Sequence, residues 1–262
     1  MIITSRTNPK VVSASLLRDK KHRDETGTFL IEGRKLFYEA VKTGIEITDI
    51  FCTEENAAYC EKCSGREVTV LSESAFEKIS TEKSPQGIIC IAKHIDKIHI
   101  LYKIYNVEKE DAKPKLILSS LRDPGNVGTV IRTANAFGIG ELILSDDCAD
   151  IYNPRTVRAA MGALFRQRIS VVSDLCQCVE NLKASGRKVY AAMLDRDAVS
   201  LSSLHCDAGT CFIVGNEGHG ISEEVLAASS GSVFIPMEKD TESLNAATAA
   251  SVFMWKLYSE LN

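Results

Sequence analysis

Short apolar runs alternate with segments of helical periodicity along almost the whole chain. The apolar stripe near the N-terminus, residues 11–17, has helical spacing and is followed by a basic turn. Up to residue 93, the pattern predicts strands at 28–33, 47–53, 67–72 and 87–93, and helices at 34–44, 54–64 and 73–80. This alternation indicates a small α/β domain.

Residues 94–114 have no clear periodicity and end in a charged stretch and a proline. Boundaries between domains fall in segments of this kind. We therefore expect a first domain over residues 1–100, a linker over 101–114 and a second domain over 115–262.

The second half begins again with a clean apolar strand at residues 115–120. Further strands are predicted at 141–146, 166–172, 188–194, 211–215 and 232–237, and helices at 127–138, 174–186, 223–230 and 244–261. Strands that alternate with helices predict a mostly parallel sheet that is covered on both faces. Ligands bind such sheets beyond the carboxyl ends of the strands, so the loops there are the first candidates for a site.

The first such loop, residues 121–138, combines turn residues with an arginine. Pro124 and Gly125 predict a tight turn, and Asn126 is placed to cap the helix that follows. Arg132 comes six residues after Asn126. A capped helix with a surface arginine would explain the same pattern without any function.

The second loop, "VGNEGHGIS", carries Gly215, Gly218 and Gly220 around Glu217. Its order, G-x-x-G-x-G, differs from the G-x-G-x-x-G of a dinucleotide site and speaks against a dehydrogenase with a nicotinamide cofactor. Gly215 ends a buried strand, where a glycine permits close approach of a ligand to the main chain. Ser222 is predicted to cap the next helix.

The third loop leads from the strand at 232–237 into the final helix. Ser243, Leu244 and Asn245 open a helix rich in alanine, serine and threonine, whose small side chains allow close packing of another helix or a partner chain. Ser243 and Asn245 could also serve as helix caps alone. Three unusual loops at strand ends of one sheet predict a site, although each loop alone is weak support.

Composition narrows the class of protein. The chain has 262 residues, of which 45% are hydrophobic and 25% charged, as in soluble globular proteins. No apolar run approaches the ~18 residues of a membrane span, and the N-terminal "MIITSRTNPK" lacks the apolar segment of a signal peptide. We therefore expect a cytoplasmic location and no membrane partner. The nine cysteines include one C-x-x-C, Cys60 and Cys63, and without a second pair they predict reduced thiols and no metal site.

The net charge of −4 argues against a nucleic-acid binder, but the basic residues are clustered. One cluster lies in the first 35 residues and another at residues 155–168, and both could bind RNA phosphates. A solvated surface of mixed charge is the alternative. The candidate RNA-binding side chains are Lys20, Lys21, Arg23, Arg34, Arg155 and Arg158.

The three loops together resemble the three motifs of the SpoU-type RNA ribose 2'-O-methyltransferases, the TrmH family of the SPOUT superfamily. The matching segments are "DPGNVGTVIRTANAFG", "VGNEGHGIS" and "IPMEKDTESLNAA", in the family's order and spacing. The segments "GTFLIEGRKLFYEA" and "SPQGIICIA" in the first half resemble the family's substrate-binding domain, which is similar to ribosomal proteins that bind folded RNA.

The resemblance implies a small ribosomal-protein-like α/β domain followed by an α/β methyltransferase domain with a trefoil knot. It also implies S-adenosylmethionine as methyl donor, an RNA substrate and a homodimer formed through the C-terminal domain. The separate N-terminal domain favours ribosomal over transfer RNA, because a module of this kind recognises the shape of a folded RNA segment.

The resemblance also assigns site residues. Asn126, Arg132, Glu217, Ser243 and Asn245 match the catalytic positions. Arg132 would act on the proton of the ribose 2'-hydroxyl or, since a guanidinium stays protonated in proteins, bind a phosphate and orient the nucleotide. Glu217 would serve either Arg132 or the positive sulfonium. The matching cofactor contacts, largely through main chain, are Gly215, Ile235 and Leu244, with Met237 as a further contact.

Two readings within the family stay open beside the leading one. The target could be transfer RNA, or the chain could be a catalytically silent RNA-binding member. All motif residues are present, which favours an active enzyme.

Overall fold

The computed structural model describes residues 2–96, 98–101, 113–216, 218–240 and 243–262. By packing, the chain divides into two compact units. Unit 1 comprises Met1–Asp96 and Asp150–Arg166, and unit 2 comprises Lys97–Ala149 and Gln167–Asn262. Most of the expected linker, 101–114, lies outside the described residues, and the expected domain boundaries stay a prediction.

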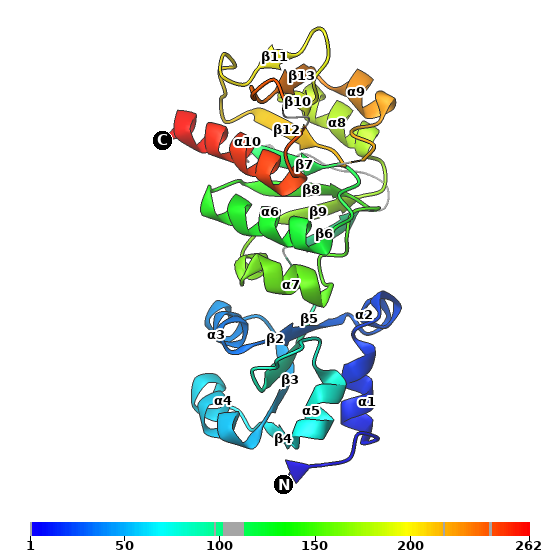
Figure 1. The fold of residues 1–262 in the computed structure, drawn as a ribbon, viewed down its shortest axis with the longest axis vertical. Helices are drawn as coiled ribbons and strands as arrows, with labels where there is room; N and C mark the ends of the chain where they lie inside the picture. Colours follow the sequence, from blue (N-terminus) through cyan, green and yellow to red (C-terminus); the bar gives the residue numbers. More distant parts are fainter. Residues whose placement is uncertain (1, 97, 102–112, 217, 241–242) are drawn as a thin grey trace. The chain divides into compact units, whose positions relative to one another are not determined.

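Unit 1 is built on a mixed sheet in the order β1-β4-β3-β5-β2 (Figure 1). Its strands are β1 (Ile2–Ile3), β2 (Thr28–Glu32), β3 (Ile47–Cys52), β4 (Thr69–Leu71) and β5 (Ile88–Lys93). Its helices are α1 (Pro9–Leu16), α2 (Lys20–Thr26), α3 (Arg34–Thr43), η1 (Glu54–Asn56), α4 (Ala57–Ser64), α5 (Glu73–Ile79), α7 (Pro154–Ala160) and η2 (Ala163–Phe165). Antiparallel pairing of β5 with β2 and β3 lines up their apolar residues around one core.

The segment Asp150–Arg166 belongs to unit 1 although it lies far along the chain. The hydroxyl of Tyr152 accepts a hydrogen bond from the main-chain N–H of Ile95 at 2.8 Å. Arg166 pairs with Glu39 at 2.6 Å, and this hydrogen bond lowers the pKa of the Glu39 carboxyl. Helix α7 therefore packs with the strands of unit 1, although it lies between β8 and β9 of unit 2 in the sequence.

Unit 2 contains an eight-stranded sheet, among the described residues, in the order β11-β13-β10-β12-β7-β8-β9-β6. All pairings between these neighbouring strands are parallel. The strands are β6 (Ile98–Leu101), β7 (Lys115–Leu118), β8 (Glu141–Ser145), β9 (Ile169–Val172), β10 (Lys188–Ala192), β11 (Val199–Ser200), β12 (Thr210–Val214) and β13 (Gly231–Phe234). The helices are α6 (Pro124–Ala136), α8 (Leu175–Ala184), α9 (Glu223–Ala228) and α10 (Ala246–Leu261).

Alternation along the strands sends side chains of unit 2 to both faces of the sheet. On β12, Cys211 and Ile213 join the core formed with α8 and α9, whereas Phe212 packs on Phe253 of α10 with ring centroids 4.7 Å apart. Figure 1 shows α6 and α10 on one side of the sheet and α8 and α9 on the other. The predicted α/β class with a mostly parallel sheet is confirmed, and the knot stays a prediction.

Three local predictions differ from the structure. The basic turn after the first helix is helix α2, begun by Asp19, whose side chain accepts a hydrogen bond from Lys21 N–H. Residues 98–101, expected in a connection, form the edge strand β6, which pairs with β9. Helix α6 starts at Pro124, so residues 124 and 125 are its first turn. Proline suits this position because its missing N–H would lack a helical partner there. Among the described residues, no helix has the length and apolar character needed to cross a membrane.

Candidate cofactor and catalytic site

A cavity of about 400 Å³ opens at the carboxyl ends of β10, β12 and β13, which are neighbours in the sheet of unit 2. Its wall is completed by the loop before α10 and by the first turns of that helix. The residues predicted to bind the cofactor, Gly215, Ile235, Met237 and Leu244, all line it, and so does Ser243. The structure therefore brings together, in one cavity, residues that the sequence places on separate loops.

A tight hairpin after β12 forms one side of the cavity. Asn216 and Gly220 exchange two main-chain hydrogen bonds, of 3.1 and 2.9 Å. The Cβ of any other residue at 215 would lie 2.6 Å from the carbonyl carbon and oxygen of Gly220. Gly215 is thus required by close packing of the protein's own main chain, and the close approach of a ligand to it stays a prediction. Glu217, the predicted partner of Arg132 or the sulfonium, lies outside the described residues.

Two further parts of the cavity were not among the predicted site residues. Met193 and Leu194 follow β10, line the cavity and are 40% and 75% exposed. Their position after a strand that neighbours β12 is the signal that could have identified them. Asn216 also lines the cavity, and its Nδ2 donates to the carbonyl of Ser120 at 2.9 Å.

The two predicted catalytic asparagines meet. Nδ2 of Asn245 donates to Oδ1 of Asn126 at 3.3 Å. Asn245 is also the N-cap of α10, and its Oδ1 accepts from the N–H groups of Ala247 and Thr248. Asn126 was expected to cap α6, but Asp123 holds that role by accepting from Asn126 N–H at 2.9 Å. The helix begins earlier than predicted, so the side chain of Asn126 is left to bond Asn245.

Arg132 lies on the exposed face of α6. It does not line the cavity, and its side chain makes no hydrogen bond or ion pair with the residues that the structure describes. Asn245 lies between Leu244 and Ala246, which line the cavity, so the Asn126–Asn245 pair sits beside the cavity wall. Arg132 makes no hydrogen bond to either asparagine.

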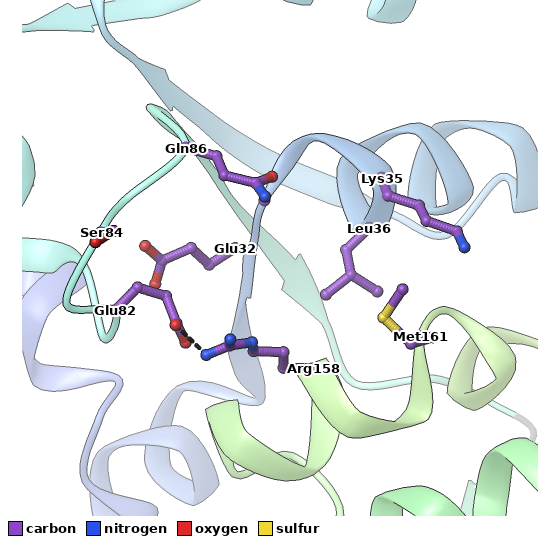
Figure 2. Close-up of a pocket in the computed structure, with 9 residues that line it drawn as sticks. Glu32, Lys35, Leu36, Glu82, Ser84, Gln86, Arg158 and Met161 are labelled. Atoms are coloured by element: carbon purple, nitrogen blue, oxygen red, sulfur yellow. Dashed lines mark hydrogen bonds and ion pairs between the residues drawn. The ribbon is translucent and has the colours of Figure 1, made fainter.

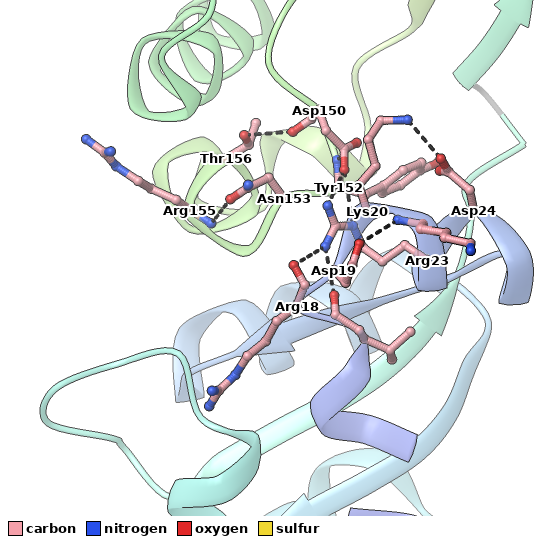
Figure 3. Close-up of polar contacts among 12 residues, drawn as sticks. Arg18, Asp19, Lys20, Arg23, Asp24, Asp150, Tyr152, Asn153, Arg155 and Thr156 are labelled. Atoms are coloured by element: carbon pink, nitrogen blue, oxygen red, sulfur yellow. Dashed lines mark hydrogen bonds and ion pairs between the residues drawn. The ribbon is translucent and has the colours of Figure 1, made fainter. Parts of the chain in front are cut away.

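One predicted RNA contact is wrong. Arg23 is buried, with 2% of its side chain exposed. Its Nε and Nη2 donate to Oδ2 of Asp150 at 3.1 and 2.5 Å, and its Nη1 donates to the carbonyls of Leu17 and Arg18 (Figure 3). A guanidinium fully engaged in this way binds the Asp150–Arg166 segment and does not face RNA.

The other predicted RNA contacts are exposed. Lys20 pairs with Asp24 at 2.8 Å, while Arg155 extends away from the Arg23 network in Figure 3. Arg34 lies 4.0 Å above the ring of Tyr59, as a cation over an aromatic face. Lys21 is 83% exposed.

Arg158 belongs to a second, smaller cavity, of about 150 Å³, within unit 1. Figure 2 shows its guanidinium paired with Glu82, on the loop that also carries Ser84 and Gln86. The floor is apolar, from Leu36 and Met161. The cavity is lined by acidic and basic side chains, and the described residues that line it form no group of metal ligands.

The cysteines do not form a metal site among the residues described. No three histidine, cysteine, aspartate or glutamate side chains are grouped there as ligands. Burial raises the pKa of the Cys90 and Cys178 thiols, so these side chains are protonated at neutral pH. They act as small core residues.

An open parallel sheet with a cavity at its carboxyl edge is the arrangement of α/β proteins that bind a ligand or cofactor beyond the strand ends. The chain belongs to the SpoU rRNA Methylase family, which it matches over residues 113–255. Residues 8–90 match the MRM3-like substrate binding domain. The predicted family is confirmed in both halves.

Individual relatives agree. The chain is 33% identical to the 23S rRNA (guanosine(2553)-2'-O)-methyltransferase RlmP of Bacillus subtilis, over 97% of this chain and 98% of that protein. It is 25% identical to the human mitochondrial rRNA methyltransferase 3, over 92% of this chain and 70% of that protein. The crystal structure of an rRNA methyltransferase from Sinorhizobium meliloti bound to AdoMet covers all of this chain and 98% of its own, with 28% identity and a TM-score of 0.83.

Proposed function

We propose that this protein transfers a methyl group from S-adenosylmethionine to a ribose 2'-hydroxyl of ribosomal RNA. The observation that carries the proposal is the cavity after β10, β12 and β13, which gathers the four predicted cofactor residues and Ser243. Family membership over both units supports the activity, and the named rRNA methyltransferases among its relatives favour ribosomal RNA.

The cavity suits S-adenosylmethionine. Its wall is largely main chain and apolar side chains, such as Ile235, Leu244 and Phe253. Such a wall offers backbone N–H and C=O groups to the edges of an adenine and packs against its faces. The cofactor supplies an electrophilic methyl group on a positively charged sulfur.

The protein's own groups would hold the nucleophile. In the reaction the ribose oxygen forms a bond to the methyl carbon, the sulfur–carbon bond breaks with its electron pair left on the now neutral sulfur, and the hydroxyl proton passes to water. Holding the two reacting atoms in line supplies a large part of the acceleration for such a step. The Asn126–Asn245 pair is placed to hydrogen-bond the ribose, and Ser243 lies on the loop that enters α10.

Arg132 would act by binding a phosphate of the RNA and orienting the nucleotide. A guanidinium presents paired N–H donors that match phosphate oxygens, and it does not give up a proton readily. Its exposure on α6 and its absence from the residues that line the cavity fit a role that a second subunit completes. We therefore assign Arg132 to the site of the partner subunit in a homodimer.

An exposed aromatic cluster on α6 and α10 supports the homodimer. Phe137, at the end of α6, lies 5.7 Å from Trp255 and 5.5 Å from Tyr258, measured between ring centroids. Trp255 and Tyr258 are 54% and 39% exposed. Exposed aromatic patches of this kind commonly mark protein interfaces.

Unit 1 would bind the RNA fold through Lys20, Lys21, Arg34, Arg155 and Arg158. The protein would act in the cytoplasm. Methylation of purified ribosomal and transfer RNA by the protein, each in unmodified form, tests the proposal. We expect methylation of ribosomal RNA alone. Methylation of transfer RNA alone would contradict the proposed substrate.

A further inference from the structure

Ser120 holds an unfavourable main-chain conformation at the carboxyl end of β7. Its φ of 57° lies in the left-handed region, which only Ser120 and Met161 enter among the non-glycine residues described. A side chain in this region costs free energy, so the surrounding structure must hold it there. Three residues later Asp123 caps α6, the helix that carries Asn126. The direction in which the chain leaves Ser120 therefore sets where this helix begins.

Two hydrogen bonds hold Ser120 in place. Its carbonyl accepts from Nδ2 of Asn216 at 2.9 Å, and its N–H donates to Oγ of Ser145 at 2.8 Å. Oγ of Ser145 donates in turn to Oδ1 of Asp147 at 2.6 Å. Burial opposes ionisation of Asp147, but hydrogen bonds from Ser145, Ser120 and Arg122 hold the pKa of its carboxyl below the usual value. The contacts follow β12, β7 and β8, which are adjacent in the sheet.

Asn216 uses its other amide atom to shape the cavity. Its Oδ1 accepts from the N–H of Gly218 at 2.8 Å and from that of His219 at 3.3 Å. These bonds close the hairpin that lines the cavity. One side chain thus joins the hairpin to the strained residue from which the chain enters α6.

We propose that Asn216 is a positioning residue, which aligns the start of α6, and with it Asn126, to the cofactor cavity by holding Ser120 in its left-handed conformation. The inference rests on the proposed function of this cavity. Asn216 is assigned no contact with the ribose or the methyl group. Its effect reaches the reaction through Ser120 and the main chain of α6.

The test is a double-mutant cycle on the full-length protein with Asn216→Asp and Ser120→Gly. Aspartate keeps an oxygen for the Gly218 and His219 N–H groups but cannot donate to the Ser120 carbonyl. Glycine adopts a positive φ without the strain of serine, so the hydrogen bond from residue 216 matters less in that background. The rate is measured with unmodified ribosomal RNA and labelled S-adenosylmethionine, and the Kd of S-adenosylmethionine by calorimetry.

We expect Asn216→Asp to lower kcat about tenfold while the Kd for S-adenosylmethionine changes less than about threefold. In the Ser120→Gly background the same change should lower kcat only about threefold. Gln177→Glu serves as control, because it also replaces an amide by a carboxylate, at an exposed position on α8. It should leave both kcat and Kd unaltered.

Two outcomes would overturn the inference. If the loss of kcat is equal in both backgrounds, Asn216 does not act through Ser120. If a weaker Kd accounts for the whole loss of rate, Asn216 only shapes the cavity. A wild-type protein that transfers no label would instead contradict the proposed function, which keeps the two failures distinct.

Discussion

Asn245 donates a hydrogen bond to Asn126 across 3.3 Å, and this contact joins the first turns of two helices that are 119 residues apart in the chain. Asn245 also caps α10 through its Oδ1. The cap fixes the side chain, and the fixed side chain aims its amide at Asn126. We therefore expect Asn245 to contribute to both stability and function.

Serine at position 245 separates these two roles. Serine caps a helix about as well as asparagine, whereas alanine costs about 1 kcal/mol. Serine is too short to reach Asn126. We expect Asn245→Ser to keep the free energy of unfolding within about 0.5 kcal/mol and to lower kcat at least about tenfold, and Asn245→Ala to lose both. Denaturant unfolding and methyl transfer measure the two effects.

The matched control is Asn8→Ser, since Asn8 is likewise an asparagine N-cap, on α1. It should change neither quantity. Full activity in Asn245→Ser would show that the contact with Asn126 has no part in the reaction.

Gly215 tests the fit of the cavity hairpin. The added methyl group in Gly215→Ala would meet the main chain of Gly220 at 2.6 Å, so the hairpin must shift away from β12. We expect the Kd for S-adenosylmethionine to rise about tenfold, or about 1.4 kcal/mol. Calorimetry measures it.

Gly218→Ala is the control in the same hairpin. Its Cβ would lie 3.4 Å from Oδ1 of Asn216, an ordinary contact, and its N–H would still donate to that oxygen. This variant should bind the cofactor normally. Equal affinities for both variants would mean that the hairpin does not shape the binding site.

Much of this site follows from the sequence. Gly215, Ile235, Met237 and Leu244 were assigned by resemblance to the family's motifs. They line one cavity because the carboxyl ends of neighbouring parallel strands meet in space. Met193 and Leu194 were missed because the loop after β10 has no distinctive residue type. The start of α6 was misplaced because Pro-Gly is typical of turns, although proline also suits the first turn of a helix.

Arg23 shows what residue type alone does not reveal. A basic residue in a basic cluster predicts contact with phosphate, but its partner Asp150 is 127 residues away and no local pattern pairs the two. The edge strand β6 was missed for a related reason. Its pairing with β9 depends on tertiary structure, and its four residues are too few to show a period.

The Arg23–Asp150 pair should stabilise unit 1. Side-chain exposures of 2% and 14% mean that loss of one partner leaves the other charged and poorly solvated. We expect Asp150→Asn to lower the free energy of unfolding by about 3 kcal/mol. Lys21→Ala, which removes an exposed pair with Glu25 at 3.9 Å, should change it by less than about 0.5 kcal/mol. Similar stabilities for the two variants would show that the buried pair is not a structural link.

Arg132 should be essential although it lies outside the cavity of its own chain. Arg132→Lys keeps the charge but loses the paired donors of the guanidinium, so we expect kcat to fall about a hundredfold with little change in the Kd for S-adenosylmethionine. Rates and calorimetry on the purified variant check this. An unaltered rate would remove Arg132 from the site.

A mixture of two inactive variants tests whether the site is shared between subunits. Each proposed site combines Asn245 of one subunit with Arg132 of the other. In a mixed dimer of Arg132→Ala and Asn245→Ser, one of the two sites therefore keeps both residues intact. Random mixing should restore about a quarter of the wild-type activity. No recovery, in a mixture shown to exchange subunits, would place Arg132 in the site of its own chain or exclude the dimer.

The most direct measurement is to incubate unmodified ribosomal RNA with the protein and labelled S-adenosylmethionine, and then to hydrolyse the RNA in alkali. Alkaline cleavage needs a free ribose 2'-hydroxyl beside the phosphodiester. The account predicts that the label is recovered in alkali-resistant dinucleotides and that Asn245→Ser incorporates it at least about tenfold more slowly. Label in single nucleotides, methylated on the base, or tight RNA binding with no transfer of label, would contradict it.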